Sequence, residues 1–182
     1  MKRFITPLIF AALSLGLSIS PAHANGSNNT SQISISETIW KNSLHGTYVS
    51  LPSLKLKSKG GAVLFVLKGV YGDRVKLMLP PTHTLAQNQP DPFSDKQLRF
   101  GRLPIWHSFD GQEYKPVLWF GLEENSNVVK ITAKHQIEPL IAKFKAGKAF
   151  SVGYVSNQQS YVEEFSLMGF SAMFERLPES EF

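Results

Sequence analysis

Histidines and carboxylates are the side chains of this protein that could carry chemistry. The sequence has five histidines and no cysteine. The absence of cysteine excludes thiolate catalysis and cysteine-based metal sites. His45, His83, His107 and His135 lie in separate segments, and none is three or four residues from another. A helical pair of metal ligands is therefore absent, and the sequence predicts neither a metal nor any other cofactor.

The carboxylates offer little more in the way of catalytic groups. Those available as general acids or bases lie in predicted turns, where solvated carboxylates are usual: Asp91, Asp95, Glu113, Glu123 and Glu124. We therefore expect a protein without enzymatic activity. A pair of carboxylates that converges in space, as in a glycosidase, would give the alternative interpretation of a cell-wall or glycan hydrolase.

One segment combines aromatic and basic side chains, as many binding surfaces do, because rings give contact area at low entropy cost. Its candidate partner-binding residues are Arg99, Arg102, Trp106, His107, Tyr114 and Trp119. The competing interpretation is that half of these rings face the core of a β-sandwich. The expected partner is an envelope or host protein. An inhibitor or immunity protein that caps a periplasmic enzyme is a third interpretation.

The last third of the chain predicts a helix, a hairpin and a second helix. The first helix has an apolar face at the spacing i, i+3, i+4, i+7, formed by Ile137, Leu140, Ile141 and Phe144. Pro139 fits its first turn, and Gly147 is the left-handed residue that would end it. Residues 149–155 and 160–166 are β-rich runs joined by a turn at residues 156–159. The second helix has its apolar stripe at Phe170, Met173, Phe174 and Leu177.

The middle of the chain reads as short strands separated by glycine and proline. Residues around Ile39 and Trp40 form either a short helix or a first strand. Residues 46–51 predict a strand that Pro52 breaks, and residues 54–57 predict an exposed edge strand blunted by lysines. Further strands are predicted over residues 62–67, 74–79, 98–100, 105–109, 117–122 and 128–133. The fold class expected is mainly β, a single antiparallel β-sandwich or barrel-like domain with two short packed helices.

The first residues have the pattern of a signal peptide. Lys2 and Arg3 precede an apolar run over residues 8–19, and Ala22-His23-Ala24 follows as a cleavage site. We predict a signal peptide over residues 1–24, a flexible lead-in over 25–36 and one domain over 37–182. The mature chain would be periplasmic, secreted or on the cell surface, without a transmembrane segment. Removal of Lys2 and Arg3 lowers the formal net charge from +5 to +3, which does not suggest a nucleic-acid partner.

Three short motifs carry a resemblance to a known family. They are residues 75–81 (VKLMLPP) followed by Leu85, residues 140–147 (LIAKFKAG) leading into residues 150–152, and residues 165–172 (FSLMGFSA) with Leu177. The pattern resembles the invasion-associated locus B family of exported bacterial proteins, over residues 62–177. Members typically carry cysteine pairs, which this chain lacks. The resemblance implies a non-enzymatic β-rich module of the envelope, linked to host-cell invasion or envelope integrity, with no catalytic residues.

Overall fold

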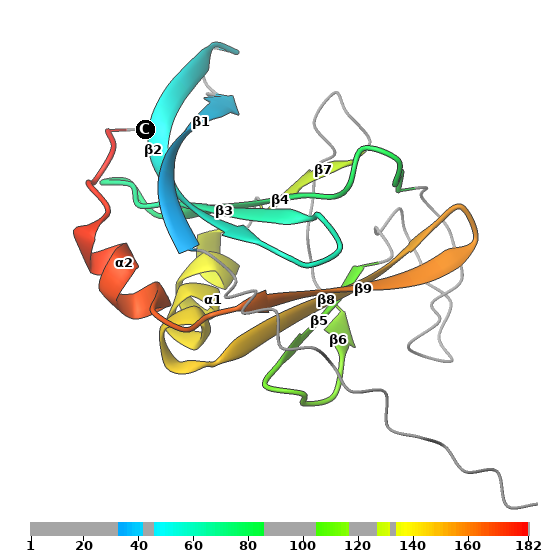
Figure 1. Ribbon diagram of the computed structural model, residues 1–182. Helices are drawn as coiled ribbons and strands as arrows, with labels where there is room; N and C mark the ends of the chain where they lie inside the picture. Colours follow the sequence, from blue (N-terminus) through cyan, green and yellow to red (C-terminus); the bar gives the residue numbers. More distant parts are fainter. Residues whose placement is uncertain (1–32, 42–45, 86–104, 117–126, 132–133, 182) are drawn as a thin grey trace, which may run out of the picture.

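Two antiparallel sheets and two helices make up the computed structural model, which describes residues 33–41, 46–85, 105–116, 127–131 and 134–181 (Figure 1). In chain order the elements are β1 (Ile33–Lys41), β2 (Tyr48–Lys57), β3 (Val63–Leu67), β4 (Arg74–Met78), β5 (Ile105–Phe109), β6 (Lys115–Pro116), β7 (Val128–Lys130), α1 (Lys134–Ala146), β8 (Ala149–Ser156), β9 (Gln159–Ser166) and α2 (Phe170–Arg176). The first sheet has the order β1-β2-β3-β4-β7, and the second has the order β6-β5-β8-β9. The prediction of a mainly β fold is confirmed, with the sheets arranged as a sandwich and not closed into a barrel.

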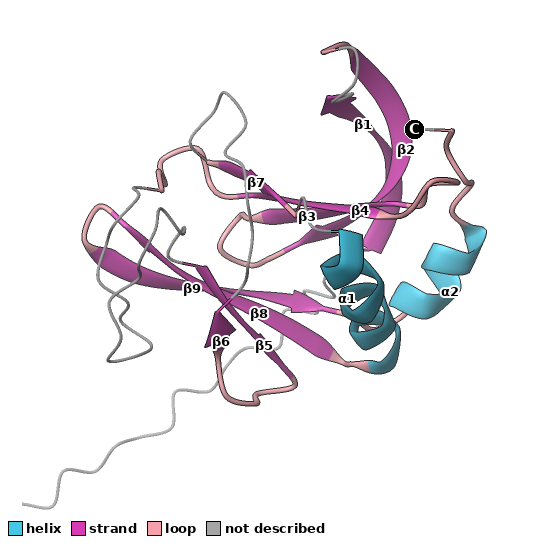
Figure 2. Ribbon diagram, turned by 180° about the vertical axis from the view of Figure 1, so that it is seen from behind, coloured by secondary structure: helices cyan, strands magenta, loops and turns pink. Residues whose placement is uncertain are grey.

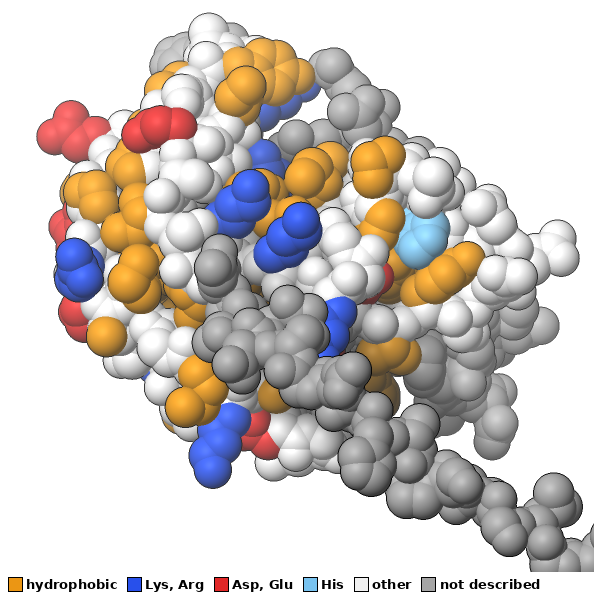
Figure 3. Space-filling model, viewed as in Figure 1, with side chains coloured by type: hydrophobic (Ala, Val, Ile, Leu, Met, Phe, Trp, Pro, Cys, Tyr) orange, Lys and Arg blue, Asp and Glu red, His pale blue; other side chains and the backbone are white. Residues whose placement is uncertain are grey.

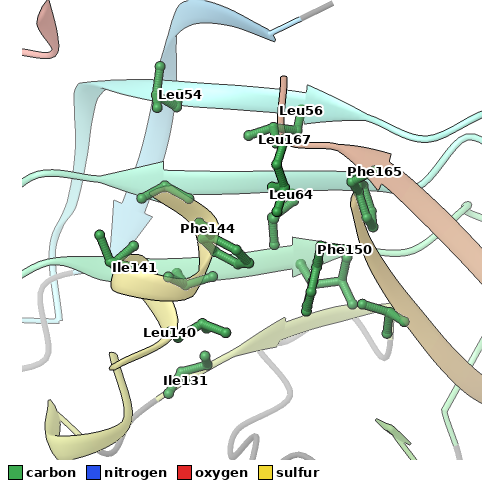
Figure 4. Packing of buried hydrophobic residues seen from close by; sticks show 14 of the residues in the cluster. Leu54, Leu56, Leu64, Ile131, Leu140, Ile141, Phe144, Phe150, Phe165 and Leu167 are labelled. Atoms are coloured by element: carbon green, nitrogen blue, oxygen red, sulfur yellow. The ribbon is translucent and has the colours of Figure 1, made fainter. Parts of the chain in front are cut away.

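The main core lies between the two sheets and is built by strict alternation along the strands. Leu54 and Leu56 of β2, with Leu64 of β3, face it from the first sheet, while Phe150 and Phe165 face it from the second. Figure 4 looks onto the first sheet and shows Phe150 and Phe165 lying over its strands, in the same buried cluster as Leu56 and Leu64. On each strand of the first sheet, the residues that alternate with these core positions point to the outer face of the sheet. The sheet therefore presents two different faces to its surroundings.

Helix α1 fills one end of the space between the sheets, with α2 beside it (Figure 2). The predicted apolar face is confirmed, since Ile137, Leu140, Ile141 and Phe144 all belong to the buried core. The helix begins at Lys134, however, so Pro139 lies beyond the first turn, contrary to the prediction. The proline removes the hydrogen bond that an N–H at this position would donate to the carbonyl of His135.

Gly147 ends α1 as predicted, but for a different physical reason. Its φ is not in the left-handed region, and its N–H donates to the carbonyl oxygen of Lys143 at 2.8 Å. A Cβ on Gly147 would lie 3.1 Å from that oxygen and 3.2 Å from Leu167 Cδ1. The glycine is therefore needed for close packing and not for its handedness.

The first two strands differ from the prediction in three ways. Of the two interpretations around Ile39 and Trp40, the structure has the strand, and β1 starts at Ile33, inside the predicted lead-in. Strand β2 runs through Pro52, which pairs with Glu37 of β1. Proline is tolerated there because β3 pairs only with residues 54–57, so β2 has no second neighbour at Pro52. The same pairing with β1 and β3 means that Lys55 and Lys57 do not lie on an edge strand.

Most of the remaining predicted elements are present. The strands at 62–67, 74–79, 105–109 and 128–133 correspond to β3, β4, β5 and β7, and the second helix to α2 with Phe170 and Phe174 buried. The predicted signal peptide and the strands at 98–100 and 117–122 lie outside the described residues. Within the part of the chain that is described, no helix has the length and apolar character needed to cross a membrane.

The β8–β9 hairpin has the predicted turn, and it supplies a testable prediction. Asn157 and Gln158 connect the strands with φ of 50° and 64°, which is a type I′ turn. A left-handed conformation is costly for glutamine and free for glycine. We expect Gln158→Gly to raise the free energy of unfolding by about 1 kcal/mol in urea titrations. Gln159→Gly, one residue later in β9, should lower it by about 0.5–1 kcal/mol, and a gain there would contradict the explanation.

Candidate functional site

The predicted partner-binding segment is only partly described, and its described residues do not form one surface. Arg99, Arg102 and Trp119 lie outside the described residues. Trp106 and His107 are neighbours on β5 and point to opposite faces of the second sheet. Trp106 is only 1% exposed and lies opposite Gly153 of β8, whereas His107 faces the core beside Phe109 and Phe150. Tyr114 is half-buried.

His107 therefore faces the core, although it is only partly buried. Burial, reinforced by the charge of Lys143, lowers the pKa of His107 to about 4, against the opposing effect of a hydrogen bond with the backbone of Lys115. The imidazole is consequently neutral at pH 7. Its Nδ1 is buried without a hydrogen-bond partner in the described structure. The sequence alternation Ile105, His107, Phe109 already placed this histidine on the apolar face of the strand.

An open hollow of about 210 Å³ lies beside this strand, between its turn and the end of α1. It is lined by Phe109, Asp110, Gln112, Lys143, Ala146 and Gly147. Asp110 Oδ1 accepts hydrogen bonds from the backbone N–H groups of Lys148 and Ala149, both at 2.8 Å, which hold the pKa of this carboxyl below its usual range. The carboxylate thus fastens the α1–β8 connection to the β5 turn. This is a structural role.

A row of basic residues crosses the outer face of the first sheet. The strand register places Lys55 of β2 opposite Phe65 of β3, Phe65 opposite Lys76 of β4, and Lys76 opposite Lys130 of β7. Together with Lys57 and Arg74, these lysines form what we call the basic face. The strands β1, β2, β3, β4 and β7 have acidic residues at none of the positions that alternate onto it. Figure 3 shows basic side chains gathered near the middle of the visible face, with most acidic ones toward its left edge.

The basic face is curved, because the end of the β1–β2 hairpin folds over it (Figure 1). Lys76 Nζ donates to the carbonyl oxygen of Ile39 at 2.7 Å, although β2 and β3 separate β4 from β1 in the sheet. The same ammonium lies 4.8 Å from the ring centre of Trp40 and 5.6 Å from that of Phe65. Trp40 in turn packs in a small second core with Val63, Phe65 and Leu67. The hairpin therefore covers Lys76, which is only 7% exposed, whereas Lys55 and Lys130 are half-buried and Lys57 is exposed.

A second polar feature lies at the end of the inter-sheet space remote from α1. Across the inner face of β8 and β9, the pair Phe150 and Phe165 gives way to Val152 and Glu163, and then to Tyr154 and Tyr161. The apolar end is thus covered by α1 and the opposite end is lined by polar groups. We call Ser58, His83, Tyr154, Tyr161 and Glu163 the polar cluster.

Hydrogen bonds connect the polar cluster to both sheets. Ser58 Oγ donates to Glu163 Oε2 at 2.5 Å, and Tyr154 Oη donates to Glu163 Oε1 at 3.4 Å. His83 Nδ1 lies 2.6 Å from Tyr154 Oη, and its ring lies 4.1 Å from that of Tyr161. Glu163 is only 4% exposed. Burial, followed by the neighbouring charge of Glu163, raises the pKa of Tyr154.

The polar cluster fastens the two sheets together more clearly than it could catalyse a reaction. Among the described residues no lysine or arginine pairs with Glu163, and the hydroxyl groups of Ser58 and Tyr154 hydrogen-bond to its carboxylate. Ser58 is 5% exposed, which leaves its hydroxyl out of reach of a substrate. In the described ranges, no three histidine or acidic side chains converge as metal ligands.

Sequence reasoning missed both features although each had a signal. The lysines of β2 were interpreted as protection of an edge, whereas their alternation with Leu54 and Leu56 indicated a basic face. Glu163 alternates with Tyr161 and Phe165, which placed it on the inner face. Comparison with known proteins adds no identification: no family model, no curated protein and no solved structure matches this chain.

Proposed function

We propose that this chain is a non-enzymatic, exported protein of the bacterial envelope that binds a linear polyanion through its basic face. Export rests on the signal-peptide pattern of residues 1–24, and the resemblance to the invasion-associated locus B family is consistent with it. The observation that carries the binding function is the row Lys55, Phe65, Lys76 and Lys130, in which Lys55 and Lys130 at the two ends are partly exposed.

The row is unfavourable for stability, which supports a role in binding. Like charges directly opposite each other on neighbouring strands are destabilising, and Lys76 lies directly opposite Lys130. Acidic residues at neighbouring outward positions would relieve this repulsion, and these strands have none. An anionic ligand bound along the row would relieve the repulsion between Lys76 and Lys130. The proposed function therefore explains an arrangement that folding alone does not favour.

The linear arrangement of the row favours an extended chain as ligand. Neighbouring strands are about 4.8 Å apart, so the row from β2 to β7 spans roughly 15 Å. The fold of the β1–β2 hairpin covers Lys76, which is only 7% exposed, so Lys55, Lys57 and Lys130 are the lysines of this face that a ligand can reach. A linear polymer with carboxylates or phosphates along its length can lie across the strands. Met78, which lies on the same face and is 37% exposed, offers it apolar contact.

Charge reversal on the basic face tests this proposal. We expect Lys55→Glu/Lys130→Glu to weaken binding to a linear polyuronate at least about tenfold, since each lysine near a polyanion contributes roughly 1 kcal/mol. Fluorescence anisotropy at two salt concentrations measures it, and the variant should show a weaker salt dependence. The matched control Lys143→Glu/Lys148→Glu changes the net charge equally on exposed lysines of α1 and its connection to β8, and should stay within about twofold.

Three results would contradict the proposal. The first is equal loss in both variants, which would mean that only net charge matters. The second is the absence of binding to polyuronate and polyphosphate alike. The third is strong binding to anionic vesicles alone, which would assign the face to a lipid surface. Hydrolysis of the polymer during the assay would favour the alternative of a glycan hydrolase.

A further inference from the structure

The exposed edge of β1 has features of an interface. Among the described residues, strand β1 is the terminal strand of its sheet and pairs only with β2. Exposed edges are usually protected by proline, bulges or repelling charge. Strand β1 has no proline and no left-handed residue, and its two charges, Glu37 and Lys41, cancel. Nothing in its sequence therefore opposes pairing with another strand.

Exposed apolar side chains gather at the same hairpin. Four of the large apolar residues that are exposed in the described structure belong to β1 and β2: Ile35 (40%), Ile39 (62%), Tyr48 (51%) and Val49 (37%). Single exposed apolar residues are ordinary, but several on one hairpin beside an open strand edge mark an interaction site. Glu37, Ile39 and Lys41 share one face of the strand.

We infer that the occupant of this edge is a second copy of the chain, with the two β1 strands antiparallel about a twofold axis at Ile39. A twofold axis perpendicular to the sheet keeps each face of the sheet on the same side, so odd-numbered residues of β1 can lie opposite only odd-numbered residues of the second copy. The register centred on Ile39 places Glu37 opposite Lys41 of the second copy, twice over. Centring on Glu37 would oppose two carboxylates, and centring on Ile35 would leave Lys41 without an acid opposite it.

In this arrangement the five-stranded sheets of the two copies form one continuous sheet. The two Ile39 side chains, the most exposed of the large apolar ones on β1, meet at the axis and leave water. Glu37 keeps its hydrogen bond from Ser50 Oγ, 3.0 Å away on β2, and Lys41 keeps its position 5.5 Å from the ring centre of Tyr48. The second copy adds a pair of opposite charges at each end of the shared ladder.

Charge swapping tests the inference with the full mature chain in sedimentation velocity over a concentration series. The wild type should dimerise at micromolar concentrations. Glu37→Lys and Lys41→Glu should each raise the dissociation constant at least about tenfold, because each places like charges opposite one another twice. An equimolar mixture of these two variants should recover the dimer, since every charge then again faces its opposite. The double variant Glu37→Lys/Lys41→Glu should also dimerise like the wild type.

Ser50→Ala is the matched control, because it removes the partner of Glu37 within the chain and leaves the proposed interface intact. It should dimerise like the wild type. The mixture experiment separates loss of the interface from loss of folding, since misfolded variants would not rescue each other. A wild type that stays monomeric throughout the series, single variants that dimerise normally, or a mixture without recovery would each overturn the inference.

Discussion

Phe144→Ala should lower the free energy of unfolding by about 3–5 kcal/mol, because it removes a ring that is fully buried at the end of the sandwich. The Phe144 ring centre lies 4.9 Å from that of Phe150, 5.8 Å from Phe109 and 5.4 Å from Phe170. It therefore joins β5, β8 and α2 through α1. A loss of this size is a large part of the roughly 5–15 kcal/mol available to a domain.

Urea unfolding followed by circular dichroism measures this loss. Glu138→Ala is the matched control on the same helix, since Glu138 is exposed, and we expect a change below about 0.5 kcal/mol. If Phe144→Ala were as mild as Glu138→Ala, α1 would not close the core. Phe109 and Phe150 would then have to be covered by something other than this helix.

Gly60→Ala is the second large expected effect, and it tests the polar cluster. A Cβ on Gly60 would come closer to both carboxylate oxygens of Glu163 than non-bonded atoms can approach. The carboxylate would have to move away from Ser58 Oγ and Tyr154 Oη, and hydrogen bonds to a charged group contribute about 1.5–3 kcal/mol each. We expect the free energy of unfolding to fall by about 2–4 kcal/mol.

A double-mutant cycle makes the cause identifiable. In a Glu163→Ala background the space beside Gly60 is open, so Gly60→Ala should then cost less than about 0.5 kcal/mol. Ser58 Oγ and Tyr154 Oη keep partners in that background, because they lie within 3.2 Å of the carbonyl of Ala62 and 2.6 Å of His83 Nδ1. An equal cost of Gly60→Ala in both backgrounds would show that the β2–β3 turn, and not Glu163, requires glycine.

The proposed binding site shows where sequence reasoning stopped. Alternation along a single strand is visible in the sequence, and it correctly separated Val75 and Leu77 from Lys76. Which lysines become neighbours depends on pairing between strands, and Lys76 and Lys130 are far apart in the chain. The six predicted partner-binding residues were grouped by closeness in sequence instead. Neighbours on a strand face opposite ways, so Trp106 and His107 could not share a surface.

The sequence by itself determined the mainly β class, the packed faces of both helices and the hairpin at Asn157 and Gln158, because these depend on local periodicity and turn geometry. Only the tertiary structure decided the order of the strands, the fold of β1 and β2 over the basic face, and the burial of Glu163 against Ser58. Those features bring together residues that are distant along the chain. Such contacts are selected by the packing of the whole core, which no local stretch of residues can specify.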